Sequence, residues 1–240
     1  MARLNKIVDE LVETEKSFVT DLYRITVGFS DFFISQEKPF IEIRELLSVL
    51  NKIRRFNRNL LREFKRADYD YGAIATTFLK NREGFAVYFM YCIHYPRAID
   101  RLLLLKKKPS FMELLMRQQM EADVILPLES YLLKPFQRIL KYPLILRKMM
   151  DYFYESEQIF WDDFSDLKGA HDLMVNLSSQ LNEHKRKLEE KQSSLIRSLP
   201  QKLDLPRRWI GCFKISSNLV KIRRTQSAES LCNLTVYDIS

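Results

Sequence analysis

The residues best suited to recognition chemistry lie in the string LESYLLKPFQRILKYPLILRKMM, from Leu128 to Met150. Its cations recur at steps of four, three and seven, which places them along one face of a helix. That face carries Lys134, Arg138, Lys141 and Lys148. A face of this kind is either a solvated basic surface or a groove wall that presents cations to an acidic partner. The spacing by itself leaves both interpretations open.

The rest of the sequence contains none of the common motifs for covalent catalysis or metal binding that we searched for. The sequence contains no GxxxxGK[ST], GxGxxG, HExxH or GxSxG motif, so four large enzyme classes lose their usual signature. The three histidines, His94, His171 and His184, are too scattered to form a local metal motif. The three cysteines contain no CxxC pair, which fits neither a disulfide framework nor a zinc site. We therefore expect no catalytic side chain, no metal and no cofactor.

The charge balance permits an acidic partner without identifying one. Lysine and arginine number 39 against 31 for aspartate and glutamate, so the net charge is 39 − 31 = +8. Nucleic acid, anionic lipid and an acidic protein surface would all satisfy this excess. An aromatic stripe that includes Phe85, Tyr88 and Tyr91 would suit base stacking, but aromatic burial dominates helix packing. We interpret the stripe as core and do not expect nucleic-acid binding.

Composition and periodicity predict an all-α fold. The 240 residues include only 5 glycines and 8 prolines, and 46% are hydrophobic, which favours long helices over a turn-rich sheet. Apolar residues at helical spacing predict seven helices. These cover residues 3–35, 42–66, 71–79, 85–105, 111–120, 121–150 and 157–195. On the first helix, the charged face opposite the apolar stripe includes Glu10, Glu15 and Asp21.

Two further features modify this helical pattern. Pro135 and Pro143 each remove a backbone donor, so we expect a kinked or broken helix between Leu128 and Met150. After about residue 198 the pattern turns to short β-branched and aromatic runs, of which 209–215, 219–222 and 231–237 resemble strands. The expected division is a helical domain at 1–198, then a linker and short β-like tail at 199–240.

Three segments resemble the Dbl homology family, the guanine-nucleotide exchange factors of Rho-family GTPases. Ile7–Leu22 is similar to the opening helix of that family, Phe85–Leu103 to its middle block, and Leu128–Met150 to its most recognisable stretch. The likeness covers about residues 3–195. It implies an elongated all-α bundle of long helices that binds the two switch segments of a Rho-type GTPase, without covalent chemistry.

The resemblance also implies roles for particular residues. Glu10 matches the glutamate that contacts switch I, and Lys141 and Asn182 match the lysine and asparagine that contact switch II. Gln137 and Arg138 match a pair that supports the GTPase-binding surface. The expected partner is therefore a Rho-family small GTPase such as Rho or Rac.

The tail leaves other questions open. The family usually has a pleckstrin homology domain after the helices, and residues 209–222 resemble the first strands of an incomplete one. Ser227, in KIRRTQSAES, is either a phosphorylation site or part of an ordinary surface loop. Without a signal sequence or an apolar span, we expect a cytoplasmic protein that is recruited peripherally to the plasma membrane or cytoskeleton.

Two other functions fit the same residues. The helical fold could serve as a non-catalytic scaffold that binds a GTPase or a cytoskeletal partner without accelerating nucleotide release. The +8 charge also suits a module that binds anionic membranes.

Overall fold

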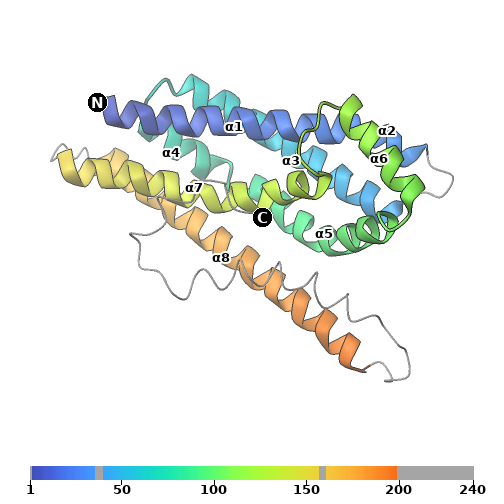
Figure 1. Ribbon diagram of the computed structural model, residues 1–240. Helices are drawn as coiled ribbons and strands as arrows, with labels where there is room; N and C mark the ends of the chain where they lie inside the picture. The colour runs from blue at the N-terminus through green and yellow to red at the C-terminus, as the bar shows by residue number, and fades with distance from the viewer. Residues whose placement is uncertain (1, 36–39, 157–160, 199–240) are drawn as a thin grey trace, which may run out of the picture. The chain divides into compact units, whose positions relative to one another are not determined.

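The computed structural model describes residues 2–35, 40–156 and 161–198, and all regular secondary structure in these ranges is helical (Figure 1). The predicted all-α class is therefore confirmed. The elements are α1 (Ala2–Gly28), α2 (Ser30–Ile34), α3 (Ile41–Arg66), α4 (Tyr71–Lys80), η1 (Arg82–Phe85), α5 (Ala86–Leu105), α6 (Pro109–Glu121), α7 (Leu128–Ser156) and α8 (Trp161–Ser198). The proposed domain boundary at 198 coincides with the end of the described residues. The three predicted strands and Ser227 lie outside the described residues.

One compact unit contains residues 1–190. Within it, α1 packs along both α3 and α7, and α3 also packs along α5 (Figure 1). None of the helices in the described ranges combines the length and the hydrophobicity needed to cross a bilayer.

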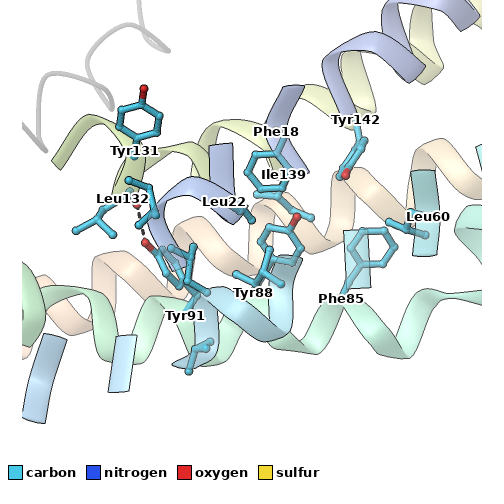
Figure 2. Close-up of a cluster of buried hydrophobic side chains, with 14 of the residues drawn as sticks. Phe18, Leu22, Leu60, Phe85, Tyr88, Tyr91, Tyr131, Leu132, Ile139 and Tyr142 are labelled. Atoms are coloured by element: carbon cyan, nitrogen blue, oxygen red, sulfur yellow. Dashed lines mark hydrogen bonds between the residues drawn. The ribbon is translucent and has the colours of Figure 1, made fainter. Parts of the chain in front are cut away.

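The core between these helices is rich in aromatic side chains. Phe85, Tyr88 and Tyr91 of the predicted stripe are all buried, so its interpretation as core is confirmed (Figure 2). The buried hydroxyl of Tyr91 donates a hydrogen bond of 2.7 Å to the carbonyl oxygen of Leu132 on α7. This hydroxyl is therefore buried together with a hydrogen-bond partner, as is usual for buried polar groups.

The helix α7 runs without a break from Leu128 to Ser156 with both prolines inside it, so of the two expected outcomes, a kink or a break, the break is excluded. Pro143 has no N–H for the carbonyl of Ile139, four residues earlier. The Ser178 hydroxyl on α8 instead donates to that carbonyl, at 3.3 Å and in a buried position. Packing and this replacement bond compensate for the donor that Pro143 removes.

The helix α8 packs on the bundle through apolar residues that recur at alternating steps of three and four from Leu167 to Leu181, which we call the seam. Leu167, Ala170, Met174 and Leu181 are buried, whereas Leu177 is only partly buried. His184 packs edge-on against Phe89 of α5, with ring centroids 6.5 Å apart.

The helices α7 and α8 run antiparallel. Tyr154 contacts Phe164, Ile139 contacts Ser178, and Phe136 lies under the Lys185 ammonium, so rising numbers on α8 meet falling numbers on α7. This register determines which residues of α7 and α8 lie at the same level.

Candidate functional site

A row of ion pairs joins the antiparallel helices α1 and α7, and we call it the α1–α7 ladder. Each of the four cations on the predicted basic face of α7 binds a carboxylate of α1. The pairs are Lys134 with Asp21, Arg138 with Glu15, and both Lys141 and Lys148 with Glu10. Of the two interpretations left open by the spacing, a freely solvated face is excluded for Lys134 and Arg138, because α1 of the same chain covers them.

Exposure to solvent differs sharply along the α1–α7 ladder. The side chain of Arg138 is 4% exposed and that of Glu15 is fully buried, whereas Lys141 is 40% and Lys148 is 54% exposed. The end of the ladder around Glu10 is therefore the part most accessible to a second protein, since Lys134 and Asp21 at the other end are only 24% and 15% exposed.

At this accessible end, the Glu10 carboxylate lies between two ammonium groups. Its Oε2 is 2.9 Å from Lys148 Nζ, and its Oε1 is 3.4 Å from Lys141 Nζ. Partial burial by itself would raise the pKa of Glu10, but the hydrogen bond and charge of Lys148 and the charge of Lys141 more than offset it. The net result is a pKa below the ordinary value, so the carboxylate is ionised at neutral pH.

The buried centre of the ladder is a fully bonded polar network. Arg138 Nε donates to Glu15 Oε2 at 2.7 Å, and Arg138 Nη1 donates to the Thr14 hydroxyl at 2.8 Å. Glu15 also accepts from Asn57 Nδ2 of α3 and from the Tyr142 hydroxyl of α7, each at 2.8 Å. A buried ion pair is tolerated only when its remaining donors and acceptors are satisfied in this way.

This network corrects one placement made from the sequence. Glu15 was expected on the charged outer face of the first helix but is buried, and Arg138, whose surroundings the spacing left open, is buried beside it. Burial of the Tyr142 ring, with the neighbouring Glu15 charge, raises the pKa of the Tyr142 hydroxyl well above its ordinary value. That hydroxyl therefore remains protonated and able to donate to Glu15.

The buried network sets the position of the accessible end. Lys141 follows Arg138 by three residues on α7, and Glu10 precedes Glu15 by five on α1. Because both helices are rigid over one turn, the Arg138–Glu15 pair fixes the register that brings Lys141 to Glu10. Arg138 therefore supports the accessible surface indirectly, by fixing the register of the two helices that form it.

Asn182 and Gln137 lie on another part of the surface. Both are exposed. Asn182 follows Ser178 by one turn of α8, and the contacts of Ser178 and Lys185 place it beside the segment 136–139 of α7, which includes Gln137. Within the described residues, no hydrogen bond or ion pair joins Asn182 to Glu10 or Lys141. The structure therefore brings Glu10 and Lys141 into direct contact and leaves the Asn182 carboxamide exposed on the neighbouring helix, without a hydrogen-bond partner among the described residues.

Two participants were missed by sequence reasoning. Lys148 was placed on the basic face, but its partnership with Glu10 was not foreseen, and Glu15 was not foreseen as the partner of Arg138. The only indication in the sequence was that the carboxylates of the first helix and the cations of α7 both recur at helical spacing. Spacing on each helix shows which residues share a face, but the pairing needs the helix register.

Chemically, this surface is suited to binding. It presents an acid, two amines and a carboxamide, with no nucleophile beside a general base. In the part of the chain that the structure describes, no cluster of three or more histidine, cysteine, aspartate or glutamate side chains could hold a metal ion.

Comparisons with known proteins give a consistent match. The RhoGEF domain family matches residues 7–182, which include Glu10, Lys141 and Asn182. Human pleckstrin homology domain-containing family G member 3 is 32% identical over 205 residues, which is 82% of this chain and 16% of that protein. The chain thus spans about a sixth of the length of this relative.

Two solved structures share the fold. One, of Vav1 inhibited by an allosteric inhibitor that blocks its GEF activity, has a TM-score of 0.71 at 24% identity and covers 85% of this chain and 52% of that chain. The other contains human RhoA, its inhibitor and the DH/PH domain of human ARHGEF11; it has a TM-score of 0.69 at 19% identity and covers 80% and 56%. At these identities the likeness shows a common fold.

Proposed function

The chain belongs to the RhoGEF domain family, and on this premise we propose that it is a guanine-nucleotide exchange factor for a Rho-family small GTPase. The family match spans the whole of the α1–α7 ladder and reaches Asn182 on α8. A DH/PH domain of the same fold is found with human RhoA, which supports a GTPase of this type as the partner.

The proposed reaction forms and breaks no covalent bond in the exchange factor. An exchange factor accelerates release by binding the empty GTPase more tightly than the loaded one, so that the difference in affinity favours loss of GDP. Such a preference needs a rigid surface with a few polar groups at fixed positions. Long helices tied together by a buried polar network meet this requirement.

Each polar group of the surface has a proposed role. Glu10 contacts switch I of the GTPase, while Lys141 and Asn182 contact switch II and hold it in a form that disfavours the bound nucleotide. Gln137 and Arg138 support the surface, Arg138 from the buried network. The observation that carries this proposal is the contact between Glu10 and Lys141 on a partly exposed surface of two packed helices.

The ion pairs of Glu10 do not prevent this role. Glu10, Lys141 and Lys148 are each more than about a third exposed, and exposed pairs contribute only about 0–1 kcal/mol. Replacing Lys148 by a group of the GTPase as the partner of Glu10 therefore costs little free energy. In the free protein, Lys148 orients the Glu10 carboxylate and lowers its pKa.

We place the protein in the cytoplasm, with peripheral recruitment to the plasma membrane or the cytoskeleton as part of the same proposal. Rho-family GTPase signalling to the cytoskeleton is the setting that the family implies.

The direct test is release of fluorescent GDP from a panel of purified GTPases, including RhoA and Rac, on addition of the chain. We expect acceleration of at least one of them. A chain that binds the GTPases without accelerating release from any of them would instead be a scaffold. Equal affinity for the nucleotide-free and GDP-loaded forms in a titration would likewise contradict the proposal.

A further inference from the structure

The solvent-facing side of α3 carries an unusual concentration of positive charge. Counting from Lys52, basic residues follow at steps of three and four, so they form one stripe along the helix opposite its buried side. We call these residues the α3 stripe: Lys52, Arg55, Arg58, Arg62, Lys65 and Arg66, all of them exposed. At 1.5 Å per residue, the stripe is roughly 20 Å long.

Within the described residues, no carboxylate neutralises the charge of the α3 stripe. In the described ranges, none of its six residues forms an ion pair, in contrast to the four cations of the α1–α7 ladder. Glu63, the acidic residue within this stretch, accepts a hydrogen bond from Asn81 at 3.1 Å. Partial burial lowers the pKa of Arg54, and repulsion from Arg58 and Arg55 lowers it further, as expected beside uncompensated cations.

Exposed apolar side chains adjoin the stripe at its N-terminal end. Tyr23 and Val27 of α1, Ile34 of α2 and Ile41 of α3 are each about half exposed. Ile34 and Ile41 also line a surface depression of about 500 Å³ between these helices. The Arg54 guanidinium lies 5.4 Å from the Tyr23 ring centroid and so joins the apolar end to the basic stripe.

We propose that this face of α3 binds the surface of an anionic phospholipid bilayer. The α3 stripe would contact the headgroups, and Tyr23, Val27, Ile34 and Ile41 would enter the boundary between headgroups and acyl chains. Exposed cations beside exposed aromatic and aliphatic side chains are the combination that binds such an interface. A nucleic acid would use the cations but would leave the aliphatic side chains without a partner.

Membrane binding at this face is compatible with a GTPase on the other surface. Asn57, on the buried side of α3, donates a hydrogen bond to the Tyr142 hydroxyl of α7 at 2.8 Å. The stripe lies on the opposite side of α3 and is therefore directed away from α7, where Lys141 lies. The inference deepens the proposed membrane recruitment but does not depend on exchange activity.

The test compares sedimentation of the chain with vesicles of phosphatidylcholine alone and with vesicles that also contain phosphatidylserine. We expect binding only to the anionic vesicles, with strong weakening when NaCl rises from about 0.1 M to about 1 M, because the Debye length falls from about 10 Å to about 3 Å. The variant Arg55→Gln/Arg58→Gln/Arg62→Gln should bind roughly 100-fold more weakly, since each cation near the surface contributes about fivefold.

Two control variants remove the same charge from other places. Arg97→Gln/Arg117→Gln/Lys168→Gln changes exposed residues of α5, α6 and α8, and Lys221→Gln/Arg223→Gln/Arg224→Gln changes the tail. Both should bind anionic vesicles within a few-fold of the unchanged chain. Equal loss in either control would overturn the inference, because net charge or the tail would then explain binding.

A third variant tests the apolar end, and the exchange assay separates this inference from the proposed function. Ile34→Ser/Ile41→Ser should weaken the vesicle binding that remains at high salt. The triple α3 variant should accelerate nucleotide release from a soluble GTPase at the same rate as the unchanged chain. A slower rate would indicate that the GTPase binds this face of α3 and would contradict the inference. Tighter binding to a DNA duplex than to anionic vesicles would also sink it.

Discussion

Glu10 and Lys141 form an ion pair of 3.4 Å across α1 and α7, so the two residues proposed to contact different switch segments contact each other in the free protein. Lys148 completes the arrangement at 2.9 Å from the same carboxylate. The surface is thus preorganised by its own charges, and a partner must replace weak, partly exposed contacts only.

The first prediction concerns Glu10. We expect Glu10→Ala to slow GDP release by more than tenfold, because removal of a polar anchor at an interface costs on the order of 2 kcal/mol or more. The melting temperature should change little, since the side chain is 34% exposed. Stopped-flow exchange and circular dichroism measure the two effects. The matched control is Glu13→Ala on the exposed side of α1, which should leave the exchange rate unchanged.

The second prediction concerns Lys148 as a positioning residue. Lys148→Met removes the strongest charged partner of Glu10, so the pKa of Glu10 should rise towards its ordinary value of 4.5. The lowered pKa makes the Glu10 pairs stabilising above that value, and this contribution is lost as the pH falls through the lowered pKa. The variant should therefore be less stable than the unchanged chain at neutral pH, by no more than about 1 kcal/mol because the pair is largely exposed, and the difference should disappear at low pH. NMR titration of the Glu10 carboxyl measures the shift, and an unchanged pKa would contradict the assigned pairing.

The third prediction concerns the buried pair of Arg138 and Glu15. Arg138→Met leaves the Glu15 carboxylate buried without its cation, so unfolding free energy should fall by about 3–5 kcal/mol. Urea unfolding followed by circular dichroism measures this loss. Arg147→Met, at an exposed position of the same helix, should change stability by less than about 0.5 kcal/mol.

A double variant tests the cause of that loss. Glu15→Leu combined with Arg138→Met removes both charges, so its loss should be smaller than the sum of the two single losses. Strict additivity would mean that the two side chains contribute independently and that the pair does not set the helix register.

The fourth prediction separates binding from packing on α8. Asn182→Ala should slow exchange at an unchanged melting temperature, because the side chain is exposed. Met174→Ala, at a fully buried position of the seam, should instead lower the unfolding free energy by about 2–5 kcal/mol. Leu177→Ala should cost less than Met174→Ala, since Leu177 is only partly buried. A large stability loss for Asn182→Ala would show that its role is structural.

Much of the fold was predictable because it depends on local periodicity. The apolar spacing predicted the helices around 42–66 and 85–105, and the structure has α3 at Ile41–Arg66 and α5 at Ala86–Leu105. The same logic could not decide whether the helix breaks at Pro143, where the cost of a proline is local but its compensation is not. The hydroxyl that pairs with the Ile139 carbonyl comes from Ser178, on another helix.

The candidate site shows the same division. Residue types and the family resemblance were enough to select Glu10, Lys141 and Asn182, and helical spacing was enough to place four cations on one face of α7. Only the packing of α1 on α7 decided that Arg138 and Glu15 are buried while Glu10 and Lys141 remain accessible. The physical reason is that periodicity specifies which side chains share a face, whereas burial and pairing depend on the register between helices distant in sequence.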